Sequence, residues 1–254
     1  MNYDYTPSFY SDEEFFNEYL GKTSYYLKLQ NITQKLISFC KPNNVLEFGS
    51  ALGTTISILA KKFPKIRFTG VDIRENVIGE SKSKFKEINN LHFECNDMCD
   101  FLNQNQNDYD FVFLLYSFHH ILDPISNKEL FLRKLYSNLS AGSHVLITET
   151  FLPEGTDPWM DIETLFQVRA LEGYASTYWE SLRSLSPIDI DLAKKIAETS
   201  SKEESIAGKL VKSRDSEYLI KFEWLVDFCK KIGFQVIISE PVNCINEKAI
   251  LLLR

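Results

Sequence analysis

The stretch between Val45 and Asp72 contains residues whose types and spacing suit the binding of a nucleoside. Gly49, Ala51 and Gly53 fill a short turn with small residues, so that a ligand could lie against the backbone. An acid, Asp72, follows about 20 residues later, at the distance from which a carboxylate holds the hydroxyl pair of a ribose. The pattern predicts an adenosine-containing ligand without deciding which one.

The apolar pattern around this turn predicts a strand, a helix and a second strand. We expect a strand at 44–49, an amphipathic helix at 53–63 and a parallel strand at 66–72. A parallel strand pair joined by a crossover helix places the backbone N–H groups of the first turn at the helix N-terminus. These groups would therefore face the ligand.

The same turn argues against two common nucleotide sites. A dinucleotide fingerprint requires G-x-G-x-x-G, whereas residues 49–54 read Gly-Ser-Ala-Leu-Gly-Thr, and Glu47 stands two residues before the turn. The phosphate-loop pattern G-x-x-x-x-G-K-[ST] does not occur in the chain. A nicotinamide oxidoreductase is therefore disfavoured.

The turn resembles motif I of the class I S-adenosylmethionine-dependent methyltransferases, in which an acid precedes a G-x-G-x-G turn. Ala51 replaces the middle glycine, which is tolerable if φ at this residue is negative. The resemblance implies S-adenosyl-L-methionine as cofactor and S-adenosyl-L-homocysteine as product. It also implies a Rossmann-like α/β fold with a seven-stranded sheet in the order 3-2-1-4-5-7-6 and an antiparallel last strand.

The resemblance further implies which residues bind the cofactor. Asp72 would hold the ribose, Ile73 would face the adenine ring, and the turn amides with Glu47 would hold the methionine end. Asp97 and Met98 match the adenine-contacting positions of the family, although Asp97 could instead be the N-cap of the next helix. The expected cofactor-binding residues are Glu47, Gly49, Ser50, Ala51, Gly53, Asp72, Ile73, Asp97, Met98, Tyr116 and Tyr26.

A histidine pair could supply a base for methyl transfer. His119 and His120 follow an apolar strand expected at 109–115, beside the first strand, where open α/β sheets bind ligands. Histidine can act as a base near pH 7 without much tuning, and we prefer His120 for contact with the acceptor. Glu149 is a second candidate base or anchor, with a solvated strand end as its alternative. No carboxylate triad accompanies the histidines, so no metal site is expected.

Three segments are expected around this chemistry. Residues 1–43 would form an N-terminal helical lid, whose tyrosines could cover the sulfonium or simply pack on the sheet. Residues 44–150 and 217–254 would form the cofactor-binding core. Residues 151–216 would form a helical cap insertion over the carboxyl edge of the sheet, or alternatively a homodimer interface.

Further elements complete the expected fold. Apart from the lid and the cap, helices are expected at 23–40, 75–88, 127–139 and 220–232, and strands at 91–95, 144–149, 234–240 and 248–254.

Composition limits the partners and the compartment. The 254 residues are 44% hydrophobic, and the net charge of −7 disfavours nucleic acid, so no DNA partner is expected. The five cysteines form no C-x-x-C pair and indicate neither a zinc site nor a disulfide framework. No signal peptide or membrane-spanning apolar run is seen, so we expect a cytoplasmic protein without a membrane partner.

Three functions remain open from the sequence. The first is methyl transfer to a small-molecule acceptor by direct in-line displacement, favoured by the acidic charge and the expected cap. The second is methylation of a protein, peptide or RNA, which predicts an open, charged rim instead of an aromatic lid. The third is a non-catalytic, cofactor-binding member of the fold, against which the set Glu47, Asp72 and Asp97 argues. Whether oxygen, nitrogen or carbon is methylated stays open.

Overall fold

A computed structural model describes residues 24–104, 109–121, 125–151, 220–241 and 247–254. The expected lid therefore lies within the described residues only from residue 24 onward. Residues 152–216 of the expected cap lie outside them.

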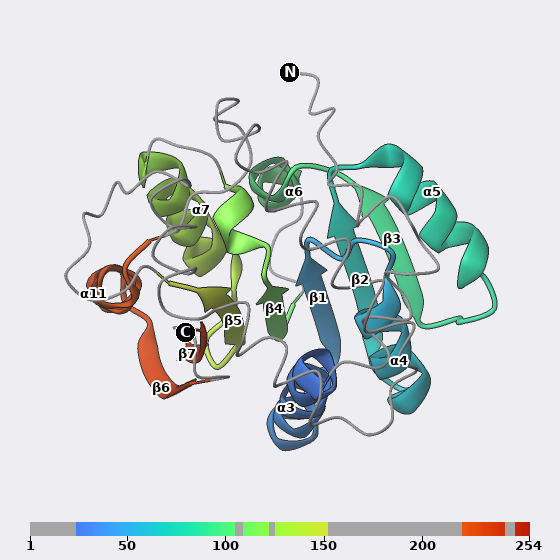
Figure 1. The fold of residues 1–254 in the computed structure, drawn as a ribbon, viewed down its shortest axis with the longest axis horizontal. Helices are drawn as coiled ribbons and strands as arrows, with labels where there is room; N and C mark the ends of the chain where they lie inside the picture. The colour runs from blue at the N-terminus through green and yellow to red at the C-terminus, as the bar shows by residue number, and fades with distance from the viewer. Residues whose placement is uncertain (1–23, 105–108, 122–124, 152–219, 242–246) are drawn as a thin grey trace, which may run out of the picture.

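A seven-stranded sheet in the order β3-β2-β1-β4-β5-β7-β6 runs through the molecule (Figure 1). Five strands are parallel, and β7 is antiparallel to both β5 and β6. This order and the reversed last strand confirm the predicted topology. The strands are β1 (Asn44–Phe48), β2 (Arg67–Asp72), β3 (Leu91–Cys95), β4 (Phe111–Leu115), β5 (His144–Thr150), β6 (Gln235–Pro241) and β7 (Glu247–Leu253).

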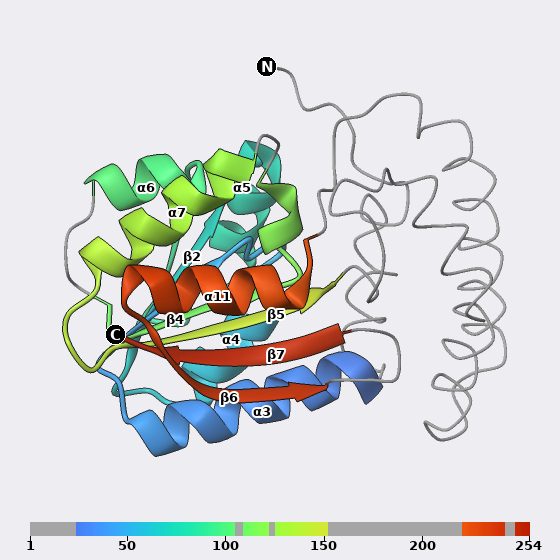
Figure 2. The ribbon, with the colours of Figure 1, turned by 90° about the vertical axis from the view of Figure 1, so that its left-hand side faces the viewer.

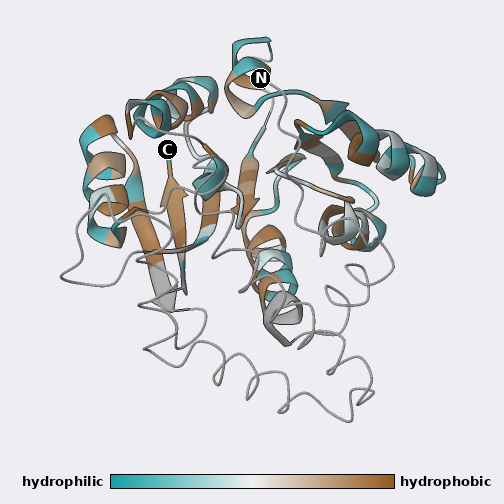
Figure 3. Cartoon of the chain, turned by 45° about the horizontal axis from the view of Figure 1, so that its top comes forward, coloured by the Kyte–Doolittle hydropathy of each residue, from teal (hydrophilic) through white to brown (hydrophobic). Residues whose placement is uncertain are grey.

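Helices cover both faces of the sheet (Figure 2). One core cluster joins the sheet to α6, α7 and α11, and a second joins its other face to α3, α4 and α5. Figure 3 shows apolar strands between helices whose surfaces are partly polar. The helices are α3 (Ser24–Cys40), α4 (Thr54–Lys62), α5 (Glu75–Lys84), α6 (Met98–Gln104), α7 (Ile125–Asn138) and α11 (Phe222–Ile232), with a short 3-10 turn, η1 (Phe118–His120).

The central strand β4 shows why the sequence folds as a doubly covered sheet. Its side chains alternate between the two core clusters, with Val112 and Leu114 in one and Phe111 and Phe113 in the other. All four are fully buried, so the strand needs an apolar residue at each position. Each such side chain stabilises the fold by roughly 1.5–3 kcal/mol relative to exposure.

Two elements are at least two residues shorter than predicted. The helix expected at 75–88 ends at Lys84, because Phe85 is its C-cap and its N–H bonds back to Ser81. The strand expected from residue 109 begins at Phe111; the Asp110 carboxylate, just before it, accepts the backbone N–H groups of Asn43 and Asn44 at the start of β1.

The parts of the chain that the structure describes include no helix with the length and apolar character required to cross a membrane.

Candidate functional site

The turn after β1 brings the backbone close to two neighbouring strands. Gly49 and Gly53 have φ values of 70° and 69°, in the left-handed region that favours glycine. The N–H groups of Gly49 and Ser50 both donate to the Val71 carbonyl of β2, at 2.8 and 3.0 Å. A Cβ atom on Gly49 would lie 2.3 Å from the Cβ of Ser117, so only glycine fits there.

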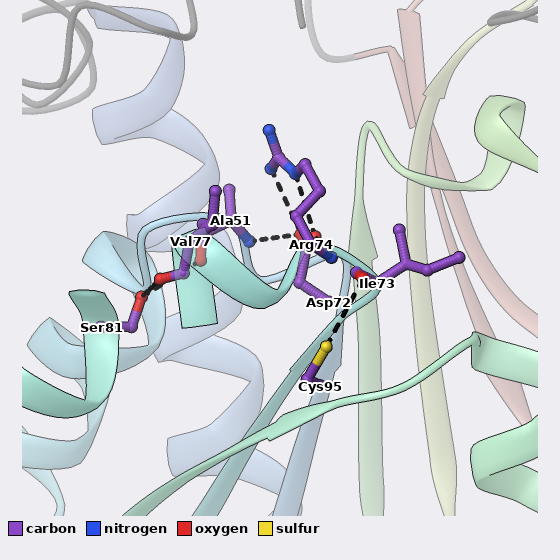
Figure 4. Close-up of polar contacts among 7 residues, drawn as sticks. All are labelled: Ala51, Asp72, Ile73, Arg74, Val77, Ser81 and Cys95. Atoms are coloured by element: carbon purple, nitrogen blue, oxygen red, sulfur yellow. Dashed lines mark hydrogen bonds and ion pairs between the residues drawn. The ribbon is translucent and has the colours of Figure 1, made fainter. Parts of the chain in front are cut away.

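Ala51 adopts a positive φ of 46°, so the condition under which alanine would fit this position without strain is not met. Hydrogen bonds hold the strained conformation: the Ala51 N–H donates to Asp72 Oδ2 at 2.9 Å, and the Ala51 carbonyl accepts from Ser81 Oγ at 3.3 Å (Figure 4). A left-handed conformation costs a non-glycine residue about 1–2 kcal/mol. Ala51 therefore adopts a backbone conformation that is typical of glycine.

Asp72 ends β2 beside this turn and is 7% exposed. Its carboxylate accepts the backbone N–H of Arg74 at 3.0 Å and pairs with the Arg74 guanidinium, with Nε 3.1 Å from Oδ1. Figure 4 shows the guanidinium lying over the carboxylate. Asp72 is thus fixed at the end of β2 in contact with the turn, and its role as a ribose ligand stays a prediction.

Glu47 lies in β1 beneath the turn and is 4% exposed. The backbone N–H of Ile56, in the first turn of α4, donates to the carboxyl group, whereas Oε2 has no partner among the described residues. Burial and, second, the nearby charge of Asp72 raise the pKa of Glu47 well above its usual value. Ser50 Oγ is also buried without a hydrogen-bond partner among the described residues, so two buried polar atoms lie unpaired near this turn.

The expected adenine contacts lie at the ends of β2 and β3. Ile73 is 51% exposed, and the Cys95 thiol donates to its carbonyl at 3.5 Å. Asp97 is the N-cap of α6, since its Oδ1 accepts the N–H groups of Cys99 and Asp100 at 2.7 and 3.2 Å. The capping alternative is therefore confirmed, and it uses only one of the two carboxylate oxygens. Contact of Ile73, Asp97 and Met98 with adenine stays a prediction.

The segment after β4 is strained and bonded to β1 and β5. Tyr116 has a φ of 53°, unusual for a bulky residue, and its N–H donates to the Thr148 carbonyl at 2.9 Å. Ser117 Oγ donates to the Phe48 carbonyl at 2.8 Å. These bonds fix the start of the segment between β1 and β5, and contact of Tyr116 with a cofactor stays a prediction. The side chain of Tyr26, the other expected tyrosine, lies outside the described residues.

His119 and Glu149 form a bonded pair at the same edge. The ring Nδ1 of His119 lies 2.9 Å from Glu149 Oε1, and the His119 backbone N–H donates to Glu149 Oε2 at 3.0 Å. Glu149 is 1% exposed, so the alternative of a solvated strand end is wrong. The ring of His120 lies 4.0 Å from that of His119 between centroids, and His120 is the more exposed residue. The carboxylate therefore orients His119, whereas the sequence led us to prefer His120.

Sequence reasoning missed two charged residues near the site. Lys128 is buried in α7, where its Nζ donates to the Ile121 carbonyl and lies 5.5 Å from the Phe118 ring centroid. Its spacing from Phe131 and Leu132 places it on the buried stripe of the helix, which the sequence alone could have revealed. Arg74 stands two residues after the strand-end acid and offered no comparable signal.

No group of His, Cys, Asp and Glu side chains within the described ranges could hold a metal ion.

Comparison with known proteins identifies the domain. Residues 46–145 match a family described as a methyltransferase domain. This match and the strand order of the sheet support a class I S-adenosylmethionine-dependent methyltransferase domain. This domain has the strand order predicted from the turn at Gly49 and from the final hairpin, so both parts of that prediction are confirmed.

Similar proteins share the domain at low sequence identity. Carboxy-S-adenosyl-L-methionine synthase of Helicobacter pylori is 22% identical over 166 residues, which are 63% of this chain and 65% of that protein. An O-methyltransferase family protein from Burkholderia thailandensis has a TM-score of 0.58 at 10% identity, covering 94% of this chain and 58% of the other. The N-methyltransferase NodS from Bradyrhizobium japonicum, solved with S-adenosylhomocysteine, has a TM-score of 0.54 at 12% identity, covering 92% and 88%. The chain thus spans less than two thirds of the first two proteins.

Proposed function

We propose that this chain binds S-adenosyl-L-methionine and transfers its methyl group to a small-molecule acceptor, releasing S-adenosyl-L-homocysteine. The observation that carries the proposal is the arrangement at one edge of the sheet. The small-residue turn and Asp72 lie at the ends of β1 and β2, and the His119–Glu149 pair lies at the ends of β4 and β5. A donor and an acceptor could meet between these two groups.

The residues present fit the cofactor. The turn at Gly49–Gly53 carries small residues, so that a ligand can approach it closely, and Asp72 lies beside it at a strand end. The unpartnered Oε2 of Glu47 is placed to attract the cationic methionine end, directly or through water. When bound, S-adenosylmethionine supplies a methyl group that its sulfonium has already activated. The protein's task is alignment, which can contribute roughly 7–11 kcal/mol.

The acceptor side of the site contains a candidate base. If the His119 ring carries its proton on Nδ1, that N–H donates to Glu149 and Nε2 becomes the basic nitrogen. His119 would thus remove the proton of a hydroxyl acceptor, with Glu149 holding the ring in place. His120, on the same turn, is the second candidate for contact with the acceptor.

Two observations favour a small acceptor over a macromolecule. The net charge of −7 disfavours a polyanion such as RNA. O-methyltransferases are among the structural neighbours, and an oxygen acceptor is the kind that benefits most from a histidine base. An oxygen nucleophile on a small molecule is the acceptor class that these observations support best.

Transfer of a labelled methyl group tests the proposal. The purified chain is incubated with methyl-labelled S-adenosylmethionine and a cell extract separated into small-molecule, protein and RNA fractions. We expect label to enter the small-molecule fraction, and to fall when Asp72→Asn replaces the native chain. Label that enters only the protein or RNA fraction would favour the macromolecular alternative instead.

A further inference from the structure

The carboxylate of Asp72 has no acceptor position left for a ribose. A carboxylate accepts about four hydrogen bonds, two on each oxygen. Oδ1 accepts the Arg74 N–H at 3.0 Å and Arg74 Nε at 3.1 Å. Oδ2 accepts the Ala51 N–H at 2.9 Å and Arg74 Nη2 at 3.3 Å. All four positions are therefore filled, as Figure 4 shows.

Only two of these four donors can leave. The Ala51 N–H belongs to the turn, which hydrogen bonds to Val71 and Ser81 hold in place. The Arg74 N–H belongs to the backbone that begins α5. The guanidinium, in contrast, is at the end of a flexible side chain that is 30% exposed and has solvent to move into. Any ligand that bonds to Asp72 through two hydroxyl groups must therefore displace the guanidinium.

The guanidinium also resembles the group that would replace it. A guanidinium presents two N–H donors side by side to a carboxylate, and the two neighbouring hydroxyl groups of a ribose present two O–H donors to the same oxygens. We propose that Arg74 sets the affinity of the cofactor site by occupying, on Asp72, the position of the ribose hydroxyl pair. This inference rests on the proposed function, since it takes Asp72 as the ribose ligand.

The size of the effect follows from the exposure of the pair. A partly exposed ion pair changes an equilibrium constant by a factor of about two to five, and the factor falls as salt screens the charges. Arg74 therefore weakens binding of a ribose ligand by about that factor. A ligand without ribose hydroxyl groups has no need to displace the guanidinium and escapes this competition.

Calorimetric titration of the full chain tests the proposal with two probes, S-adenosylhomocysteine and its 2′,3′-dideoxy analogue. Arg74→Met removes the donors but keeps the length of the side chain, and Arg74→Lys keeps the charge but removes the fork. Arg67→Met is the matched control, because Arg67 lies at the other end of β2 and bonds to Asn44. Circular dichroism and melting curves establish that each variant is folded.

We expect Arg74→Met to bind S-adenosylhomocysteine about two- to fivefold more tightly than the native chain, with less difference at high salt. Arg74→Lys should lie between the two, Arg67→Met should equal the native chain, and the dideoxy analogue should not respond to Arg74→Met. Equal or weaker binding of S-adenosylhomocysteine by folded Arg74→Met and Arg74→Lys overturns the inference. If no variant binds S-adenosylhomocysteine, the proposed function itself fails.

Discussion

Two carboxyl groups at the ends of adjacent strands have opposite environments. Asp72 receives four hydrogen-bond donors, two of them from the Arg74 guanidinium, whereas one oxygen of Glu47 has no described partner. Burial and the charge of Asp72 therefore raise the pKa of Glu47 and favour its neutral form. The two neighbouring carboxyl groups therefore differ in their hydrogen-bond partners: Asp72 is fully bonded, whereas Glu47 keeps one oxygen without a described partner.

The raised pKa of Glu47 has a consequence for stability. The folded chain holds the proton of Glu47 more tightly than the unfolded chain. The stability that this proton contributes is therefore complete below the unfolded pKa of about 4.5, and it is lost as pH rises through the folded pKa. Glu47→Gln keeps the neutral shape and removes the proton. We therefore expect the variant to gain stability relative to the native chain as pH rises above 4.5, by at most about 1.4 kcal/mol per pH unit.

Urea unfolding at several pH values measures this difference. Exposed Glu94, in β3, provides the control, and Glu94→Gln should follow the native chain at every pH. A constant difference between Glu47→Gln and the native chain would show that Glu47 is ionised throughout.

The strained Ala51 predicts a stabilising substitution. Ala51→Gly removes the left-handed penalty of about 1–2 kcal/mol, while the greater freedom of glycine in the unfolded chain returns about 0.4–1 kcal/mol. The free energy of unfolding in urea should rise by about 0.5–1 kcal/mol. Ala60→Gly, in the buried part of α4, should instead lower it by about 1 kcal/mol. A loss of stability on Ala51→Gly would contradict the strain.

The His119–Glu149 pair predicts a kinetic result once the labelled acceptor is known. Loss of a base typically lowers the rate about 10²–10⁴-fold, so His119→Ala should lower kcat by such a factor without changing the affinity for S-adenosylhomocysteine. Glu149→Gln should also lower kcat. His92→Ala is the control: the His92 side chain is exposed on β3, and the substitution should leave kcat unchanged. A larger loss for His120→Ala than for His119→Ala would make His120 the base.

At the scale of elements, Asn90 ties two connections together. It lies before β3, and its side-chain amide donates to the carbonyls of Ala60, Phe63 and Ile66, at 3.0, 3.1 and 2.8 Å. One amide thus satisfies the end of α4 and the loop leading to β2, which carries Asp72.

Asn90→Ala should therefore destabilise the fold by about 2 kcal/mol, because the carbonyls of Ala60 and Ile66 lose the amide donor, whereas Phe63 still accepts the N–H of Ile66. Asn138→Ala is the matched control, since the Asn138 amide reaches only the carbonyl of Lys134, and it should cost well under half as much. Equal losses in thermal or urea unfolding would show that the three bonds to Asn90 contribute nothing beyond an ordinary helix-end contact.

The sequence predicted the elements better than their contacts. The apolar pattern of β4 and the small-residue turn at Gly49 depend on local packing, which composition and spacing reveal. The positive φ of Ala51 was missed because tertiary bonds to Asp72 and Ser81 impose it against the residue's own preference. The pairing of His119 with Glu149 was missed as well, because the two residues are 30 positions apart and meet only when β4 and β5 align.

At the scale of the whole molecule, the sheet order brings together residues that are far apart in the chain. Because β1 lies between β2 and β4, the turn that follows β1 is flanked by Asp72 on one side and by Ser117 on the other. The antiparallel strand β7 pairs with β5, and Lys248 of β7 lies opposite Glu149 in this pairing. The donor and acceptor sides of the proposed reaction are therefore consequences of one topology.

Binding of S-adenosylhomocysteine tests the central claim most directly. Calorimetric titration compares the native chain with Asp72→Asn, which preserves the shape of the side chain and removes its charge. We expect the native chain to bind in the micromolar range and the variant to bind about ten- to hundredfold more weakly, because hydrogen bonds to a charged group are lost. No binding by the folded native chain, or equal binding by the variant, would contradict the account.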